Sequence, residues 1–363
     1  MTMPSCTAPV KTTPMNILPI SILKYCGDLF GPIITRLVDL SFTEGKFLEM
    51  FKVGQVTSLL QKSGAVTSDM LNFRPITNLN TIVKILECLK LKQLRHHIKC
   101  SPNIDPLQAA YWALQLKLRW PRWFMTCWLL LTANLHLCCC HWISAELSAL
   151  SAAIASFNLR KNCSALLTWY SIGYSCGRKH FVAVDCWLLS TFKLSAGVPQ
   201  GSVLGSVLFG IFTTPVEKLI NSYDISYHQF ADDTRLYTAI KSLSPSNLAV
   251  ISVCADAVTG WHIMNDLLLN PTKMKALLTC TRQQVMKLDQ SGGIPVFDVD
   301  VLFISKLWVL GVKLDCHLSF DDLITNDIRV CNYHIRALHP IHPLIKRETT
   351  YTIACSLVCT RLA

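Results

Sequence analysis

The stretch Phe230-Ala231-Asp232-Asp233 is the most informative part of this 363-residue chain. Polar and apolar residues alternate on both sides of it, from Ile225 to Gln229 and from Thr234 to Tyr237. This alternation predicts a β-hairpin with the two carboxylates at its tip. Adjacent carboxylates at a turn are either solvated turn formers or oxygen ligands for a divalent cation. Two such cations, about 3.5–4 Å apart, can hold the attacking and leaving oxygens of a phosphoryl transfer.

A second informative segment lies about thirty residues before the hairpin. It reads Gly197-Val198-Pro199-Gln200-Gly201-Ser202-Val203-Leu204-Gly205. Glycine and proline predict a loop in which the backbone can approach a ligand closely. The apolar residues that follow have helical spacing: Val203, Leu204, Val207, Leu208, Ile211 and Phe212. The segment therefore predicts a loop that leads into a buried helix.

The two segments together resemble the GVPQGSVLGP and YADD motifs of reverse transcriptases from non-long-terminal-repeat (LINE-type) retrotransposons. The resemblance covers about 300 residues, in four further segments. Asn72–Leu79 is similar to NYRPISNLP, Ile104–Gln108 to FDPFQ, Trp261–Lys273 to W…LQLNPDKTE, and Leu310–Phe320 to LGV…LSF. It implies an α+β right-hand polymerase fold with fingers, a palm built on a small antiparallel sheet, and a partial helical thumb.

The third catalytic position of this family departs from the motif. The family has an aspartate in a segment similar to LLDLSAAFDTVDH, about forty residues after FDP. Here Glu146 stands 41 residues after Asp105, followed by Leu147-Ser148-Ala149. The longer side chain of glutamate moves its oxygens by about 1 Å, and a displacement of that size can cost on the order of 10²-fold in rate. Ser151 takes the place of the family's aromatic residue, which excludes ribonucleotides.

The resemblance implies a role for each matched residue. The catalytic and metal-binding residues are Asp232, Asp233 and Glu146. The nucleotide-binding residues are Arg74, Lys62, Gly197, Gln200, Gly201 and Lys273. The implied cofactor is Mg²⁺ or Mn²⁺, and the implied partners are an RNA template, a DNA primer and deoxynucleotide triphosphates, with no protein partner. The expected function is RNA-directed DNA polymerisation by a truncated element. The alternative is a catalytically inactive, nucleic-acid-binding relic.

Residues 120–145 differ from the polar sequence that the family has there. Compensating frameshifts in a decayed element would produce such an interrupted match, and so would divergence alone. From Trp123 to Ala145 the chain has 23 residues without Lys, Arg, Asp or Glu, preceded by Lys117, Arg119 and Arg122. That length suits a transmembrane helix. An ordinary buried helix and strand is the third interpretation.

Composition favours a large chain with a polyanionic partner. Lys and Arg total 34 against 23 Asp and Glu, a net charge of +11. Eight of these basic residues, against two acids, lie between Lys84 and Arg122, where they could follow a phosphate backbone or form a solvated helix face. The 17 cysteines show no zinc-site spacing. Without a leader of basic and then apolar residues, we expect an intracellular protein, in the nucleus or the cytoplasm.

The expected organisation follows the same motifs. Residues 1–16 are predicted to be disordered and 17–60 to be a helical extension. The fingers, with the unusual insert, take 61–140. The palm takes 141–280 and the partial thumb 281–363. Asn80 or Thr81 is expected to cap a helix that runs to Ile98.

Overall fold

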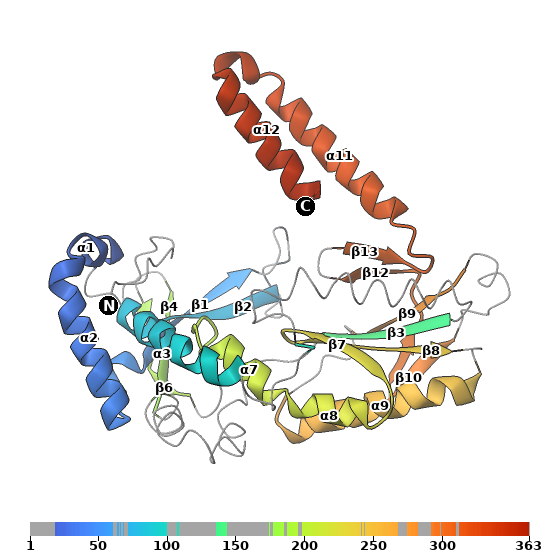
Figure 1. Ribbon diagram of the computed structural model, residues 1–363, viewed down its shortest axis with the longest axis horizontal. Helices are drawn as coiled ribbons and strands as arrows, with labels where there is room; N and C mark the ends of the chain where they lie inside the picture. Colours follow the sequence, from blue (N-terminus) through green and yellow to red (C-terminus); the bar gives the residue numbers. More distant parts are fainter. Residues whose placement is uncertain are drawn as a thin grey trace.

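The computed structural model describes residues 19–60, 72–99, 107–108, 136–143, 177–184, 187–194, 198–240, 244–267, 274–281, 292–297, 299–309 and 312–362, with 64, 66, 68, 174 and 242. Figure 1 shows these parts in a row: two amino-terminal helices, a first sheet, a second sheet and a helical hairpin that rises away from the second sheet. The expected disorder of residues 1–16 lies outside the described residues.

The amino-terminal extension is only partly helical. Helices α1 (Ile20–Tyr25) and α2 (Gly27–Glu44) form it, and α2 ends at Gly45, whose φ of 65° is left-handed. A short turn, η1 (Glu49–Phe51), then leads into strand β1 (Val53–Leu60). The prediction of helix up to residue 60 is therefore wrong for 53–60. That segment pairs with residues 73–78 on one side and with the distant residues 179–182 on the other, and these hydrogen bonds override its local pattern.

The first sheet has the order β2-β1-β4-β5, and β6 also pairs with β4. Its other strands are β2 (Phe73–Asn78), β4 (Lys179–Val184), β5 (Trp187–Leu188) and β6 (Phe192–Lys193). Helix α3 (Thr81–Lys99) follows β2 directly. The side chain of Asn80 accepts a 2.8 Å hydrogen bond from the backbone N–H of Ile82, which confirms the predicted start of this helix.

One apolar core joins the first sheet's helices to α2. Helix α7 (Gly205–Phe212) is the buried helix expected after the glycine-rich loop, and six of its eight residues are buried. Buried side chains from three helices meet here: Ile34 and Val38 of α2, Val83 and Leu86 of α3, and Val207, Leu208, Phe209, Ile211 and Phe212 of α7. The loop before α7 is therefore attached to a rigid base.

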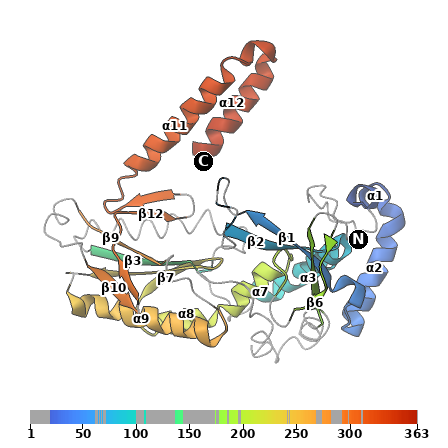
Figure 2. The ribbon, with the colours of Figure 1, turned by 180° about the vertical axis from the view of Figure 1, so that it is seen from behind.

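The second sheet is antiparallel and has the order β7-β8-β3-β9. Its strands are β7 (Ser226–Phe230), β8 (Asp233–Ile240), β3 (His136–Ile143) and β9 (Lys275–Thr279). Helices α8 (Pro215–Asn221) and α9 (Pro245–Met264) cover one face (Figures 1 and 2). Buried side chains from both helices pack against Leu236 and Ile240 of β8. The mixed helices and antiparallel sheet confirm the expected α+β class.

Strand β3 corrects the transmembrane interpretation of residues 123–145. Residues 136–143 are extended and pair with β8 on one side and β9 on the other. A strand in the middle of a sheet cannot belong to a spanning helix, because its backbone groups bond to neighbouring strands. The palm was predicted to begin at residue 141, but the second sheet already begins at His136 with β3.

Among the described helices, α9 alone has the length and composition to cross a membrane, over Ser246–Met264 with a mean hydropathy of 1.2. Its inner residues Ile251, Cys254, Ala255 and Val258 belong to the core under the second sheet. Core helices commonly combine such length and apolarity, so burial against the sheet accounts for this composition.

The carboxyl-terminal part begins with two small hairpins, β10 (Gly293–Val296) with β11 (Val299–Leu302) and β12 (Lys306–Val309) with β13 (Val312–Asp315). Helices α11 (Asp321–Leu338) and α12 (Arg347–Leu362), joined through η7 (His342–Leu344), then project away from the sheets (Figures 1 and 2).

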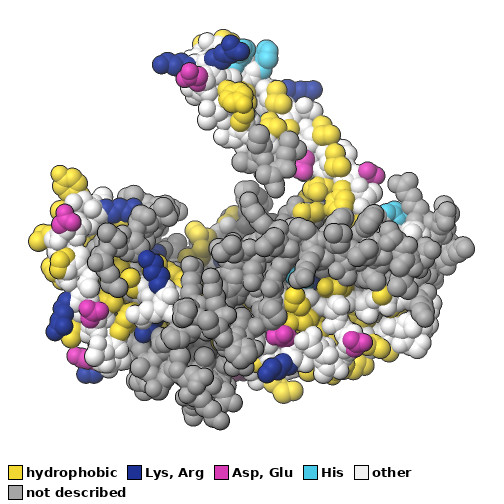
Figure 3. Space-filling model, in the orientation of Figure 1, with side chains coloured by type: hydrophobic (Ala, Val, Ile, Leu, Met, Phe, Trp, Pro, Cys, Tyr) yellow, Lys and Arg dark blue, Asp and Glu magenta, His cyan; other side chains and the backbone are white. Residues whose placement is uncertain are grey.

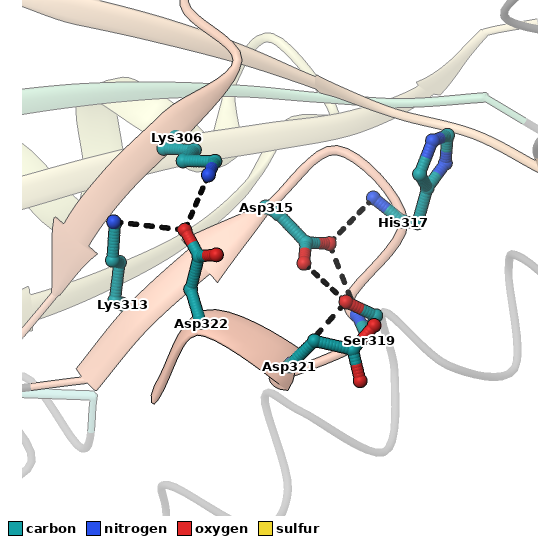
Figure 4. Close-up of polar contacts among 7 residues, drawn as sticks. All are labelled: Lys306, Lys313, Asp315, His317, Ser319, Asp321 and Asp322. Atoms are coloured by element: carbon teal, nitrogen blue, oxygen red, sulfur yellow. Dashed lines mark hydrogen bonds and ion pairs between the residues drawn. The ribbon is translucent and has the colours of Figure 1, made fainter. Parts of the chain in front are cut away.

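Polar contacts join α11 to the strands before it. Asp322 is paired with Lys306 of β12 and, at 2.8 Å, with Lys313 of β13 (Figure 4). Asp315 accepts hydrogen bonds from the backbone N–H groups of His317 and Ser319, at 2.8 and 3.0 Å. These contacts fix the turn from which the helical hairpin starts.

Candidate active site

The two carboxylates lie where the sequence predicts them, at the tip of the β7–β8 hairpin. Phe230 pairs with Asp233, so the loop has only two residues, Ala231 and Asp232. All four residues are partly buried. Strands on both sides of so short a loop restrict its conformation, and the positions of the two carboxylates are therefore narrowly defined.

Ala231 has an unusual backbone conformation. Its φ is 55°, in the left-handed region that glycine adopts easily and alanine does not. The cost for a non-glycine residue is about 1–2 kcal/mol. A positive φ at the first loop residue suits the twist of a two-residue hairpin, and such strain persists when surrounding contacts hold it.

Gln108 supplies such contacts. Its side-chain Nε2 donates a 3.0 Å hydrogen bond to the carbonyl oxygen of Ala231, and its Oε1 accepts a 2.9 Å hydrogen bond from the N–H of Ala231. The backbone N–H of Gln229 also donates to the carbonyl of Leu107, at 3.3 Å. Gln108 is only 1% exposed. Sequence comparison placed this residue in the FDPFQ-like segment without giving it a role.

The middle strand of the sheet ends beside the carboxylates. Strand β3 runs antiparallel to β8, and its last residue, Ile143, pairs with Asp233. Glu146 lies outside the described residues, three positions further along the chain. Three residues of chain span at most about 10 Å. The strand thus brings the chain toward the hairpin tip just before the position at which the third carboxylate is predicted.

The glycine-rich loop is attached to strand β2. The N–H of Thr77 donates a 2.6 Å hydrogen bond to the carbonyl oxygen of Gln200. Gly201 has a φ of 113°, and a Cβ there would lie 2.7 Å from the carbonyl oxygen of Thr77. Only glycine allows this close approach. Arg74 lies on the same strand and has an exposed side chain. Strand β2 therefore brings together Arg74, Gln200 and Gly201, three of the predicted nucleotide-binding residues.

A buried glutamate holds the end of this loop that leads into α7. Glu87 of α3 accepts 2.5 Å hydrogen bonds from the backbone N–H of Val203 and from the hydroxyl of Tyr174. Burial raises the pKa of Glu87, while the hydrogen bond from Tyr174 and the charge of Arg178 act in the opposite direction. The Nε of Arg178 donates to the carbonyl of Tyr174 at 2.8 Å. No motif in the sequence predicts this contact, because its partners lie 116 residues apart.

Some predicted residues lie outside the described part of the chain: Lys62, Gly197, Lys273 and Glu146, with Ser151. Within the predicted basic stretch, Lys90 is buried, with its Nζ 4.1 Å from the centre of the Phe42 ring. Burial lowers the pKa of Lys90. This lysine therefore packs against α2 and does not contribute to a phosphate-binding surface, whereas Lys92 on the same helix is exposed.

Basic side chains also gather at the outer end of the helical hairpin, where Figure 3 shows Lys, Arg and His together. The exposed residues there are Arg336, His339, His342, Lys346 and Arg347.

Within the described ranges, no group of three or more His, Cys, Asp or Glu side chains is arranged to hold a metal ion. Of the three carboxylates that the motifs predict, Asp232 and Asp233 lie among the described residues.

Comparison with protein families gives a match over residues 60–313 to the family described as reverse transcriptase (RNA-dependent DNA polymerase). The chain belongs to the reverse transcriptase family. The match includes the second sheet, the first sheet except nearly all of β1, the glycine-rich loop and the Asp232-Asp233 hairpin, so the expected right-hand polymerase fold is confirmed. Reverse transcriptases as a family act on nucleic acids and depend on divalent metal ions.

The reverse transcriptase domain is also similar to a curated protein, the RNA-directed DNA polymerase from mobile element jockey of Drosophila melanogaster. The two are 29% identical over 158 residues, which are 41% of this chain and 16% of that protein. The chain therefore spans about a sixth of the length of this relative. With the family match, this similarity confirms the expected origin in a retrotransposon of the non-long-terminal-repeat type.

Two solved structures are similar to the domain at lower identity. One is an apo telomerase from Candida tropicalis, 14% identical, covering 75% of this chain and 55% of the telomerase, with a TM-score of 0.46. The other is telomerase from the same organism in complex with a fragment of telomeric RNA. It is 13% identical and covers 90% of this chain and 56% of the telomerase, with a TM-score of 0.48.

Proposed function

We propose that this chain is an RNA-directed DNA polymerase that transfers deoxynucleotides to a primer at the tip of the β7–β8 hairpin. The observation that carries the proposal is the position of Asp232 and Asp233. Asp232 lies in the two-residue loop between paired strands, and Asp233 is the first residue of β8, next to the end of β3. Their chemistry fits the family's metal ions, because hard divalent cations prefer carboxylate oxygens.

The proposed metal ligands are Asp232, Asp233 and Glu146, and the proposed ion is Mg²⁺ or Mn²⁺. When bound, the ions would lower the pKa of the primer 3′-hydroxyl and neutralise charge on the triphosphate. The hairpin would hold its carboxylates in position to bind these ions beside the attacked phosphate. Glu146 retains the charge of the family's aspartate but is longer by one methylene.

The remaining predicted residues would bind the nucleotide. Arg74 suits a triphosphate because its planar guanidinium can bind two phosphate oxygens at once, and its side chain is exposed. Gly197, Gln200 and Gly201 would form the floor under the incoming nucleotide and the template. Lys62 would face the triphosphate with Arg74, and Lys273 would assist the departure of pyrophosphate. The net charge of +11 favours an RNA template and a DNA primer as partners.

A second candidate function is nucleic-acid binding without catalysis. The specific observation that favours it is the glutamate at position 146, since a misplaced third ligand would weaken metal binding. The two functions differ in extension of the primer, and both predict binding of a primed RNA template.

The test is primer extension on a primed RNA template, first in Mg²⁺ and then in Mn²⁺. The Asp232→Asn, Asp233→Asn double variant keeps the shape of both side chains but removes their charge. An Asp39→Asn, Asp327→Asn variant changes the net charge equally at two positions outside the hairpin. We expect extension by the wild type and the control, and none by the hairpin variant.

Binding of the same substrate, measured by fluorescence anisotropy, separates the alternatives. A folded wild type that binds the primed template without extending the primer would favour the non-catalytic function. Extension that persists in the hairpin variant would contradict the proposed site. A folded wild type that neither binds the primed template nor extends the primer would contradict both functions.

A further inference from the structure

We propose that Gln108 is a positioning residue, which fixes the turn that presents Asp232 and Asp233. This inference rests on the proposed function of the hairpin and adds a residue to it. Gln108 lies 123 residues before Ala231 in the chain, and both polar atoms of its amide bond to the backbone of that one residue. It therefore acts on the carboxylates through the peptide that precedes them.

The first step of the argument is the conformation of the turn. Ala231 has a positive φ, which alanine does not adopt readily by itself. Ala231 lies beyond the last pair of the β7–β8 ladder, Phe230–Asp233. Gln108 bonds to both its N–H and its C=O, at 2.9 and 3.0 Å. The turn is thus held in its strained form by contacts from another segment.

The second step is how firmly Gln108 itself is held. Its side chain is 1% exposed, and its backbone forms an isolated parallel bridge with Gln229 of β7. The carbonyl of the preceding residue, Leu107, accepts a hydrogen bond from the N–H of Gln229. Because its side chain is buried and its backbone is bonded to the hairpin, Gln108 can move little relative to the turn. The turn therefore has one well-defined geometry.

The third step is the requirement for glutamine. The site needs one donor and one acceptor on a single planar group of this length. An ionised glutamate accepts from the N–H of Ala231 but cannot donate to its carbonyl. Asparagine is shorter by one methylene. Methionine has a similar length and makes neither hydrogen bond, so Gln108→Met removes both contacts with little change in volume.

The first test measures the turn directly, by hydrogen exchange of the Ala231 amide in the full chain. We expect exchange at least about tenfold faster in Gln108→Met than in the wild type, because opening of the turn then costs less. Gln55→Met is the matched control, since Gln55 is also a buried amide but lies on β1. The control should leave exchange at Ala231 unchanged. Equal exchange in Gln108→Met and the wild type would overturn the proposal.

Gln108→Glu keeps the volume and the polarity, and it covers the case in which Gln108→Met does not fold. Protonation of this glutamate would restore a donor as well as an acceptor. The ratio of its Ala231 exchange rate to that of the wild type should therefore approach one as the pH falls. A ratio that does not change with pH would contradict the requirement for a donor.

The second test concerns the carboxylates. We expect Gln108→Met to raise the dissociation constant for Mn²⁺ and to lower kcat by about 10²-fold, with an unchanged KM for the deoxynucleotide. Faster exchange at Ala231 with unchanged Mn²⁺ affinity and kcat would show a purely structural contact and overturn the positioning role. A wild type that neither binds Mn²⁺ nor extends a primer would refute the proposed function. The exchange of Ala231 would then decide alone whether Gln108 fixes the turn.

Discussion

The Oε2 atom of Glu87 accepts a hydrogen bond from the backbone N–H of Val203, 116 residues later in the chain. This contact joins α3, which follows the Arg74 strand, to the end of the glycine-rich loop. The middle of the loop bonds to β2 through Gln200 and Thr77. Because the loop is held at these two points, changes at Glu87 and at Gly201 should each disturb the proposed nucleotide site.

Replacement of Glu87 tests the first anchor. Glu87→Ala removes the acceptor of the Tyr174 hydroxyl and of the Val203 N–H, and it removes the negative charge near the Arg178 guanidinium. We expect a loss of about 2–4 kcal/mol in the free energy of unfolding, measured with urea. Glu44→Ala, at an exposed surface pair with Lys46, should change it by less than about 1 kcal/mol. Similar losses in the two variants would contradict the anchoring role.

The pH dependence of stability gives a second measurement at Glu87. Burial raises the pKa of this carboxyl above its ordinary value of 4.5. The folded state then binds the proton more tightly than the unfolded state. Protonated Glu87 therefore contributes fully to stability below pH 4.5, and this contribution is lost as the pH rises through the pKa of the folded state. The stability of the wild type relative to Glu87→Gln should therefore fall from pH 4.5 upward. A rise would indicate that Arg178 stabilises the ionised form.

Gly201→Ala tests the second anchor. The new Cβ would lie 2.7 Å from the carbonyl oxygen of Thr77, at a φ of 113° that alanine tolerates poorly. We expect a loss of about 1–3 kcal/mol in stability, together with weaker deoxynucleotide binding. Gly260→Ala is the control, because nothing lies within 4 Å of its Cβ position on α9. That change should increase stability by about 0.5–1 kcal/mol. Unchanged nucleotide binding by Gly201→Ala would argue against the loop as the site's floor.

The contacts at the start of α11 can be tested by titration. Hydrogen bonds from Lys306 and Lys313 lower the pKa of Asp322 to about 2. The ion pairs of Asp322 therefore contribute to stability above pH 3.8, and this contribution is lost as the pH falls toward 2. In Lys306→Met, the pKa of Asp322 measured by carboxyl-carbon NMR should move toward 3.8, whereas Lys24→Met should leave it unchanged. An unshifted pKa in Lys306→Met would mean that Lys313 alone holds the carboxylate.

Glu146→Asp tests the third proposed metal ligand. If β3 directs position 146 to the hairpin tip, the shorter carboxylate restores the family's arrangement. Primer extension should then increase by about 10²-fold, provided that the wild type is limited by this ligand. Glu146→Gln should abolish extension, because the amide removes the charge. Equal activity in all three chains would show that position 146 is not a ligand.

Local sequence patterns were sufficient for several elements. The alternation around Asp232 and Asp233 predicted the β7–β8 hairpin, the spacing of apolar residues predicted α7, and Asn80 predicted the start of α3. In each case the information lies within about ten residues, because periodicity, capping and turn chemistry are local properties. The motifs also identified the family, since each motif reflects a local requirement of the site.

Only the tertiary structure determined the rest. Strand β1 was not predicted, and for the segment that contains β3 the sequence left a spanning helix and a buried helix and strand both open. Apolar runs suit a helix or a strand equally, and long-range pairing decides between them. The contacts of Gln108 with Ala231 and of Glu87 with Val203 join positions more than a hundred residues apart. No local pattern encodes such pairs, because their partners meet only when the sheets and helices have packed. The sequence alone thus determined the carboxylates and their hairpin, and the tertiary structure determined what holds them in place.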